Sequence, residues 1–352
     1  MEQFQIMSRG IEQAHEHPAD RFLSGGGEMG ERIRRFDWSK TVLGPVEDWP
    51  QSLRSAVSIL LPSKAQIVLF WGPELITIYN DAYRPVLGGK HPRVLGLPAR
   101  ETWNELWTTV LKDLFEGVIN TGEAYWASDR PFFMERFQYD YKEETFFDVS
   151  YDPVRDETGK VGGIFCIVSE TTTRVLAERR LKTLRELSAC TTQAKSAEDV
   201  CQAAARILTA NRYDVPFASI YLLDSEAKLA RLAASVGVPA RSAAAPACIH
   251  VARTESHPKE WPLAKVWESG RTEVVKDLNG HFGVLPGGAW PESPSTAVVL
   301  PLKKGSGQDR LAGFLIAGVS PRRPLDDQYG GFFDLLANQI ETAVSNARAY
   351  EE

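Results

Sequence analysis

Cysteine is scarce in this chain. Four occur among 352 residues, at positions 166, 190, 201 and 248, and no two of them form a short-spaced pair. A disulfide framework or a structural zinc site needs such pairs, so this spacing argues against both. We expect reduced thiols in a cytoplasmic protein, and no metal site.

Long apolar runs are missing as well. The most apolar stretch, residues 66–79, is broken by Gly72, Pro73 and Glu74. A membrane-spanning helix needs about 18 or more consecutive apolar residues, so none is predicted. Residues 1–20 are polar and acidic, unlike a secretion signal. We therefore expect no contact with a membrane.

An excess of positive charge is also absent. The chain has 40 Lys and Arg against 46 Asp and Glu, a formal net charge of −6, and no long basic run. This balance argues against a nucleic-acid partner. A hydrophobic content of 43% and a charged content of 24% describe an ordinary globular chain. Its length favours two domains.

Motifs for phosphate transfer are not found. The glycine-rich Asp-x-Gly-x-Gly of an ATP-binding kinase domain does not occur, and His15-Glu16 lacks the Arg-Thr-Pro context of a phosphoacceptor. Gly25, Gly27 and Gly30 have dinucleotide-site spacing but follow no buried strand. The chain is therefore predicted not to be an enzyme by itself.

The pattern of apolar residues predicts an α+β protein with two modules. Residues 1–27 read as a flexible arm, and residues 28–171 as the first module. Its predicted strands are 65–71, 75–79, 125–135, 145–154 and 161–169, with a helix at 104–120 between the second and third. This order describes a five-stranded antiparallel sheet with helices on one face.

Three short motifs of the first module resemble the PAS fold. They are Tyr79-Asn80-Asp81-Ala82-Tyr83 at the end of the second strand, Leu95-Gly96 in the helical segment, and Glu170-Thr171-Thr172 just before a helix. The segment from Phe36 to Pro50 is similar to the leader of PAS modules in bacterial sensor and hybrid histidine kinases. The resemblance covers roughly residues 28 to 185.

The second module, residues 191–325, resembles a GAF domain. A helix at 197–210 precedes predicted strands at 217–223, 229–236, 272–275, 297–301 and 312–319. The resemblance rests on that leading helix, on Tyr221-Leu222-Leu223-Asp224, on Ser269-Gly270-Arg271 and on Gly313-Phe314-Leu315. Like the first module, it is expected to contain an antiparallel sheet with flanking helices.

Two helices carry seams with a period near 3.5, which is typical of coiled coils. The helix at 172–190 joins the modules and repeats at Ala177, Leu181, Leu184 and Ser188, with Arg179 and Arg180 outside the seam. The helix at 326–352 has no stop signal and reads as a transmission helix leading to an absent output domain. Its small or apolar positions are Tyr329, Phe333, Leu336, Ile340, Ala343, Ala347 and Tyr350.

These seams predict a parallel homodimer in which Leu181, Leu184, Leu336, Ile340 and Ala347 carry the contact or the signal. A competing interpretation is that the last helix packs on its own domain.

The combined resemblance implies the N-terminal sensory region of a bacterial sensor histidine kinase of the hybrid type. A stimulus would then pass through dimeric helices to a kinase domain and, indirectly, to a response regulator. Two alternatives stay open. One is a bilin- or haem-binding photoreceptor or gas sensor, and the other is a purely structural dimerisation platform.

The aromatic residues of the first module could line a pocket for an unknown small molecule or fill a core, and the sequence leaves both open. The candidate pocket residues are Tyr79, Asn80, Tyr83, Trp103, Trp107, Phe115, Trp126 and Phe147. The corresponding candidates in the second module are Cys248, His250, Trp261 and Phe282.

No cofactor is expected. His91, the one histidine of the first module, lies in a loop and not on the helix from which a PAS domain usually ligates haem. No cysteine precedes Cys166, which argues against a flavin adduct. Cys248 and His250 are one residue apart, whereas bilin-binding GAF domains usually have them adjacent. Clustered redox thiols, which a sulfoxide reductase would need, are not indicated.

Overall fold

The computed structural model describes residues 22–136, 141–191, 196–224, 229–251, 260–304 and 311–351. The chain divides into two compact units, Met1–Thr172 and Thr173–Glu352. Each unit has its own antiparallel sheet and its own helices. The predicted α+β class with two modules is therefore confirmed. Among the described residues, no helix combines the length and hydrophobicity needed to cross a bilayer.

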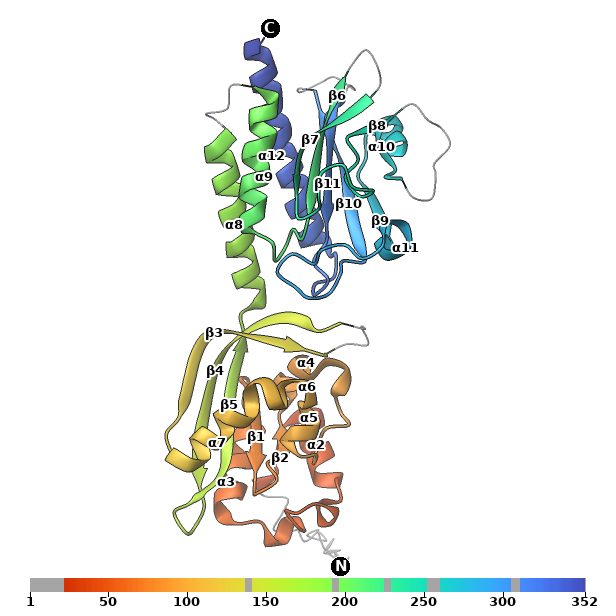
Figure 1. The fold of residues 1–352 in the computed structure, drawn as a ribbon. Coiled ribbons are helices and arrows are strands. Elements are labelled where there is room, and N and C mark those ends of the chain that lie inside the picture. The colour runs from red at the N-terminus through yellow and green to blue at the C-terminus, as the bar shows by residue number, and fades with distance from the viewer. Residues whose placement is uncertain are drawn as a thin grey trace, which may run out of the picture. The chain divides into compact units, whose positions relative to one another are not determined.

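The sheet of the first unit has five strands in the order β2-β1-β5-β4-β3, all antiparallel, as predicted (Figure 1). The strands are β1 (Gln66–Trp71), β2 (Ile76–Tyr79), β3 (Tyr125–Met134), β4 (Glu143–Arg155) and β5 (Val161–Glu170). In β1 every residue after Gln66 is buried, so both of its faces are covered. In β4 burial largely alternates, which is the pattern of a strand with one covered face.

Short helices cover one face of this sheet (Figure 1). The segment between β2 and β3 contains η3 (Asp81–Tyr83), α4 (Arg84–Leu87), η4 (Gly88–Lys90), α5 (Ala99–Thr102), α6 (Asn104–Leu106), η5 (Trp107–Leu111) and α7 (Lys112–Thr121). The helix predicted over 104–120 is thus three consecutive pieces, and η5 is a π-helical segment. Such segments are rare and are frequently found at functional sites.

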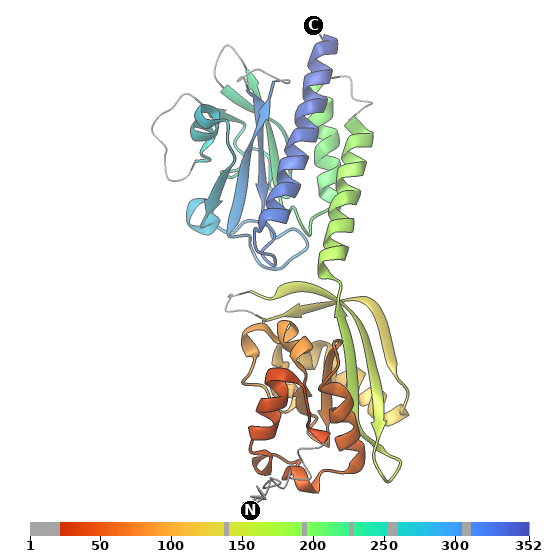
Figure 2. The same ribbon diagram turned by 180° about the vertical axis from the view of Figure 1, so that it is seen from behind.

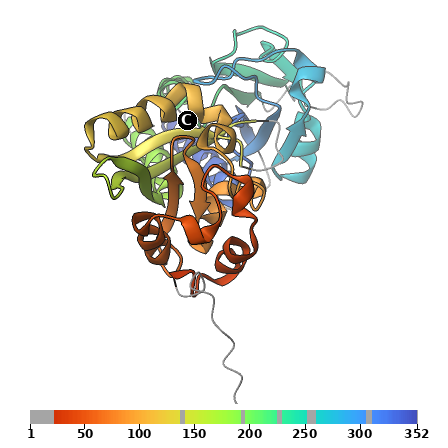
Figure 3. The same cartoon turned by 90° about the horizontal axis from the view of Figure 1, so that it is seen from below.

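The N-terminal helices also belong to the first unit. They are α2 (Gly27–Arg35), η1 (Trp38–Lys40), η2 (Val46–Asp48) and α3 (Gln51–Leu60). Figure 2 shows α3 from behind, and Figure 3 shows these red to orange helices on the near side of the unit when seen from below. Trp38 and Trp49 meet edge to face at 5.0 Å within the core. Gly96 has φ of +79°, and a Cβ there would meet the ring of Phe36 at 2.4 Å, which explains the glycine of the Leu95-Gly96 motif.

The sheet of the second unit has six strands in the order β8-β7-β6-β11-β10-β9. They are β6 (Ala218–Asp224), β7 (Leu229–Val236), β8 (Cys248–His250), β9 (Glu273–Lys276), β10 (Thr296–Lys303) and β11 (Leu311–Gly318). Five of them were predicted. The edge strand β8 was not, because a three-residue strand after a Pro- and Ala-rich loop has too few positions to show an alternation.

Helices lie on both faces of the second sheet (Figure 1). The long helices α8 (Thr172–Thr191), α9 (Ala197–Ala210) and α12 (Asp327–Glu351) are on one side, and α10 (Leu263–Ser269) and α11 (Leu278–Phe282) are on the other. Alternate residues of β6 enter two separate cores: Ile220 packs toward α9 and α12, and Tyr221 packs toward α10. Covering on both faces explains why β6 is apolar almost throughout.

The last helix packs on its own unit, so the competing interpretation is confirmed. Leu336 and Ile340 are fully buried, Ala347 is 3% exposed, and all three belong to the core shared with α9 and the sheet. The prediction that these residues contact a second copy is therefore wrong. A 3.5 and a 3.6 period diverge by only about 20° per heptad, and three heptads stay within one buried stripe of roughly 100°.

The predicted seam of α8, unlike that of α12, is mostly exposed. Thr183 and Leu187 are buried in the second unit, whereas Ala177 and Ser188 are exposed. Leu181 is 46% exposed, and Leu184 is partly buried against the core. The predicted seam of α8 thus lies mainly on the side that its own unit does not use.

Candidate functional site

A small apolar cavity lies between the sheet and the short helices of the first unit. Its volume is about 40 Å³, far below the roughly 300–1,000 Å³ of typical ligand pockets. Its lining includes Tyr83, Tyr151 and Cys166, and burial raises the pKa of all three well above their usual values. Most of the aromatic side chains of this unit therefore fill a core, and only a small space is left at its centre.

Four of the eight predicted pocket residues line this cavity: Tyr83, Trp103, Phe115 and Phe147. Trp107 lies just behind them and meets Phe115 edge to face at 6.1 Å. Tyr79 and Asn80 are buried but are not among the residues that line the cavity.

The prediction for Trp126 is wrong, because this side chain is 70% exposed. In β3 Trp126 pairs with Ser150 of β4, whereas its neighbour Tyr125 pairs with Tyr151, which lines the cavity. Adjacent residues of a strand point to opposite faces, so the choice between Tyr125 and Trp126 depends on register. The sequence reasoning missed Tyr151, although its alternation with Phe147 and Val149 was visible.

Asn80 has a structural role. Its Oδ1 accepts hydrogen bonds from the backbone N–H groups of Ile67 (3.2 Å) and Tyr83 (3.1 Å). Its Nδ2 lies within 3.2 Å of the carbonyl oxygens of Leu60, Ser63 and Ala65. The amide is thus fully occupied by backbone groups and is not available to a ligand, which corrects its assignment to the pocket.

Both ring nitrogens of His91 contact other side chains. Its Nδ1 lies 2.9 Å from the hydroxyl of the buried Tyr79, and its Nε2 lies 3.3 Å from Oε1 of Glu28 on α2. Burial lowers the pKa of His91, against the opposing influence of Glu28. Both ring nitrogens are engaged, so neither is free to ligate a haem iron.

A β-bulge places Arg130 on the inner face of the first sheet. The register of β3 against β4 shifts between Ala127 and Arg130, and Asp129 has a positive φ of 49°. Oδ1 of Asp148 holds the bulge by accepting hydrogen bonds from Ser128 Oγ and the N–H of Asp129, both at 2.8 Å. After the bulge, Arg130 pairs with Phe147, whose ring lines the cavity.

The end of β5 carries a buried ion-pair cluster. Arg136, 6% exposed, forms a two-pronged contact with Glu170 (2.7 and 3.0 Å) and a further one with Glu143 (3.1 Å). Thr172 Oγ1 lies 2.8 Å from Glu170 Oε1, and it accepts the N–H of Phe146 at 3.0 Å. Burial works against the charge of Arg136, but the two glutamates raise its pKa. The Glu170-Thr171-Thr172 motif therefore anchors the chain where β5 ends and α8 begins.

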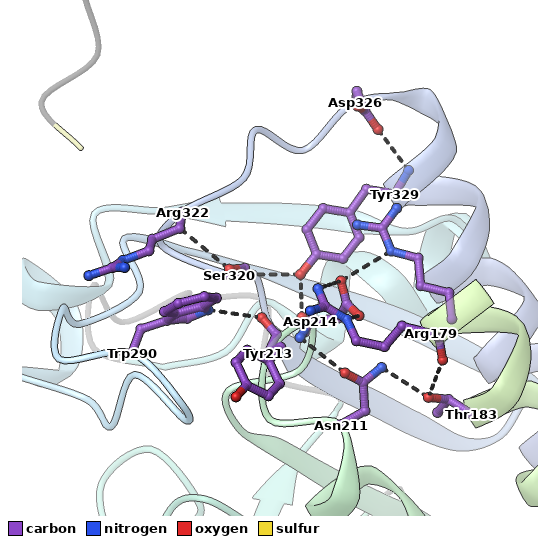
Figure 4. Close-up of polar contacts among 11 residues, drawn as sticks. Arg179, Thr183, Asn211, Tyr213, Asp214, Trp290, Ser320, Arg322, Asp326 and Tyr329 are labelled. Carbon is purple, nitrogen blue, oxygen red and sulfur yellow. Dashed lines mark hydrogen bonds and ion pairs between the residues drawn. The ribbon is translucent and has the colours of Figure 1, made fainter. Parts of the chain in front are cut away.

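The second unit contains a buried polar hub around Asp214 (Figure 4). Asp214 is completely buried in the loop between α9 and β6. Its carboxylate accepts hydrogen bonds from Arg179 Nε (2.8 Å), Arg179 Nη2 (3.1 Å) and Arg180 Nε (3.1 Å), both residues of α8. Asn211 connects the same loop to Thr183 of α8 at 2.9 Å. Four polar contacts thus hold α8 to this loop.

The same loop is bonded to the first turn of α12. The hydroxyl of Tyr329 donates to the backbone oxygen of Asp214, and it accepts the N–H of Ser320 at 3.0 Å (Figure 4). The guanidinium of Arg180 lies 4.0 Å from the centre of the Tyr329 ring, a cation–π contact. Burial raises the pKa of Tyr329, so its hydroxyl stays protonated and keeps donating. Incoming and outgoing helices therefore share one buried hub.

This hub was missed by the sequence reasoning, which placed Arg179 and Arg180 outside the seam of the connecting helix. The available signal was weak: two adjacent arginines on a helix and an Asn-x-x-Asp spacing in a distant loop. Only the tertiary structure joins α8 to a loop about 35 residues later.

Three of the four candidates in the second module surround one surface depression. Cys248 and His250 are exposed on the same side of β8, and the lining also includes Trp261 and Glu260. Phe282 stacks on Trp261 at 4.3 Å. The depression has a volume of about 370 Å³. Trp261 itself is buried and donates from Nε1 to the carbonyl oxygen of Ala244 at 2.8 Å.

The other described thiols are inert. Burial raises the pKa of Cys201 to about 12, and Cys166 is buried in the first unit. A thiol with so high a pKa is neither nucleophilic nor a ready metal ligand. The side chain of Cys190 lies outside the described residues. Over the part of the chain that the structure describes, no cluster of His, Cys, Asp and Glu could hold a metal ion.

Comparisons with known proteins extend these findings. The family model for the PAS fold matches residues 65–176, and the family model for the GAF domain matches residues 194–345.

Three solved structures are similar to the chain at low identity. The GAF domain of a phosphoenolpyruvate-protein phosphotransferase from Acinetobacter has 16% identity and a TM-score of 0.36, over 48% of this chain and 95% of that one. A free methionine-R-sulfoxide reductase from Neisseria meningitidis has 19% identity and a TM-score of 0.35, over 48% and 90%. The GAF domain of a phosphotransferase of the same kind from Coxiella burnetii has 18% identity and a TM-score of 0.36, over 49% and 96%.

The two family matches agree with the element order and the sheets described above, and they confirm the predicted order of the modules. The chain therefore carries a PAS-fold domain followed by a GAF domain.

Proposed function

We propose that this chain is the sensory input region of a cytoplasmic signalling protein, a histidine kinase, whose output domain follows α12. The PAS unit receives the stimulus, and the GAF unit passes it on. The observation that carries this proposal is the buried hub in which Asp214 binds α8 while its backbone oxygen binds Tyr329 of α12. A displacement of α8 thereby changes the surroundings of the first turn of α12.

The mechanism is a shift between two packings of the helices. Interfaces held by a few buried polar contacts switch between discrete arrangements, because a half-broken buried ion pair is costly. The anchor at Glu170 and Thr172, where β5 leads into α8, is the point at which the PAS sheet transmits a change.

In this proposal the protein forms a parallel homodimer through the exposed seam of α8. Leu181 is the best test position because it is 46% exposed, whereas Leu184 also packs in its own core. Leu181→Asp is expected to convert a dimer into a monomer, measured by light scattering after gel filtration. Leu335→Asp on α12, where the leucine is 51% exposed, is the matched control and should leave the dimer intact. A dimer that survives Leu181→Asp would refute the seam.

The kinase assignment is tested in the parent protein. Incubation with labelled ATP should give acid-labile phosphohistidine, and Asp214→Asn should leave basal labelling in place while removing its dependence on the stimulus. If the parent protein forms no phosphohistidine, the kinase assignment is wrong and the sensory region serves another class of output domain. The chain itself is proposed to have no enzymatic activity, since the described thiols that a reductase would need are separated and mostly buried.

One alternative is favoured by a specific observation. The exposed Cys248 beside His250 offers an accessible thiol at a surface depression, as a bilin adduct would need. An absorption spectrum of protein expressed with biliverdin decides this. A visible band that survives gel filtration and disappears in Cys248→Ala would establish a photoreceptor, and a colourless protein would exclude it.

The small cavity of the PAS unit favours a second alternative, a purely structural dimerisation platform. This alternative predicts that no small molecule stabilises the PAS unit. Binding of a small carboxylate to the PAS unit would support the sensory function over the structural platform.

A further inference from the structure

We propose that the PAS unit binds a small organic carboxylate, with the anionic group held by Arg130 and the apolar group directed along the aromatic wall toward the internal cavity. This inference rests on the proposed sensory function and names the class of ligand that the site accepts.

The guanidinium of Arg130 is only partly satisfied by hydrogen-bond partners. The side chain is only partly exposed, and within the described residues no acidic group forms an ion pair with it. Its Nη1 donates to the hydroxyl of Tyr125, and its Nε is buried without an acceptor. Arg136, on the same side of the molecule's first sheet, is bound by two carboxylates. A buried guanidinium N–H without an acceptor lowers the stability of the folded protein. Such a group in a native structure needs an explanation, and ligand binding is one.

The backbone before Arg130 determines the direction of this side chain. The bulge at 127–130 and the left-handed Asp129 are held by Asp148 through two hydrogen bonds. Without the one extra residue of the bulge, Arg130 would pair with Phe146 and lie on the opposite face of the sheet from Phe147. Bulges frequently redirect a side chain next to a functional site, and a strained non-glycine residue persists only where its surroundings enforce it.

A series of aromatic rings connects Arg130 with the cavity. The guanidinium lies 5.4 Å from the centre of the Tyr125 ring. Tyr125 packs on Tyr151 at 5.8 Å, and Tyr151 meets Phe115 edge to face at 5.4 Å. Tyr151 and Phe115 both line the cavity. The path is apolar at one end and cationic at the other, which matches a carboxylate with a short aromatic or branched group.

The cavity is smaller than the proposed ligand. A cavity of about 40 Å³ holds only part of such a molecule, so binding requires that a wall move. The π-helical segment Trp107–Leu111 is the best candidate, because Leu111 lines the cavity and Trp107 contacts Phe115 from outside. Single π-helical turns inside α-helices are rare and are frequently found at functional sites. Ligand binding would thus be coupled to a change in the PAS unit, as a sensor needs.

The test uses three carboxylates, benzoate, phenylacetate and isovalerate, each with its neutral amide as the matched probe. Binding to the full chain is followed by thermal unfolding and by calorimetry. At least one carboxylate is expected to stabilise the wild-type protein, while its amide binds about tenfold more weakly or worse. Arg130→Gln should abolish the difference between acid and amide, and Arg155→Gln, an exposed arginine of β4, should preserve it.

A second readout needs no ligand. If the role of Arg130 is to bind the ligand, Arg130→Gln should leave the stability of the free protein unchanged or increase it. Arg136→Gln should lower that stability. The inference is overturned if none of the three acids binds, if acid and amide bind equally, or if Arg130→Gln destabilises the free protein as much as Arg136→Gln. Binding of an amide that is independent of Arg130 would reject the carboxylate class while leaving the sensory function intact. The dimer test with Leu181→Asp bears on the sensory function alone.

Discussion

Asn80 holds three backbone segments together, because one amide group reaches the end of α3, the start of β1 and the turn after β2. No other side chain type offers an acceptor and two donors in so short a reach at this point. Its burial means that any backbone group it releases loses its partner without gaining water.

Asn80→Ala is therefore expected to lower the free energy of unfolding of the PAS unit by about 3 kcal/mol. Chemical denaturation followed by circular dichroism measures the change. Asn104→Ala is the control, because Asn104 is exposed at the start of α6 and should change stability by no more than about 0.5 kcal/mol. Equal effects of the two substitutions would contradict the role assigned to Asn80.

His91 makes the PAS unit sensitive to pH. Burial lowers its pKa below the ordinary value of 6.5, while Glu28 partly offsets this and Arg84 and Arg32 reinforce it. Above pH 6.5 the imidazole is neutral in both the folded and the unfolded chain, so it contributes no pH dependence. As the pH falls through 6.5, the unfolded chain takes up a proton that the folded chain does not, and stability falls until the lower folded pKa is passed.

His91→Gln should therefore lose less stability than the wild type between about pH 7.5 and about pH 5.5, as measured by thermal unfolding at matched ionic strength. His250→Gln, at an exposed position of β8, should behave like the wild type over the same range. A wild-type and a His91→Gln protein with parallel pH profiles would show that the histidine does not titrate differently on folding.

At the scale of elements, α8 and α12 contrast with each other. The two helices have similar heptad spacing, yet α12 uses its seam for its own core, and α8 leaves most of its seam exposed. What attaches α8 to the GAF unit is instead the hub at Asp214, together with Leu187 and part of Leu184. The attachment of α8 therefore depends on a few polar contacts and not on a wide apolar stripe.

Asp214→Asn is expected to cost about 3 kcal/mol of stability in the GAF unit, because two arginines lose a buried counter-charge. Hydrogen exchange should become faster in α8 and in the first turn of α12. Glu273→Gln is the control, since Glu273 pairs with an exposed lysine, Lys265, and such pairs contribute at most about 1 kcal/mol. Unchanged exchange in α12 would contradict the role of the hub in coupling the two helices.

At the scale of the whole molecule, the chain has separate cores. One fills the PAS unit, and two lie on the opposite faces of the GAF sheet. Units with their own cores and their own sheets can unfold separately.

Asn80→Ala should therefore lower the midpoint of one thermal transition by roughly 5–10 °C and leave the other in place. Scanning calorimetry detects the two transitions, and hydrogen exchange of β1 against β11 assigns them. A single transition that moves as a whole would mean that the units unfold together.

Much of the architecture followed from the sequence. Strand-period alternation and turn residues predicted all five strands of the PAS sheet, and the Asn-x-Ala-aromatic and Leu-Gly motifs indicated its family before any contact was known. These features are local: each depends on residues within about ten positions of one another, and local geometry decides them. The order of the modules and the α+β class are therefore properties of the sequence by itself.

The tertiary structure decided what depends on register and on distant partners. Trp126 and Tyr125 are adjacent in the chain, and only the pairing with β4 determines which ring reaches the cavity. Leu336 and Ile340 are buried against the sheet and α9. A heptad pattern alone does not determine whether such residues pack on their own domain or on a second copy. The hub at Asp214 and the unpaired Arg130 likewise arise from contacts between remote segments and from a bulge, which no periodicity in the sequence encodes.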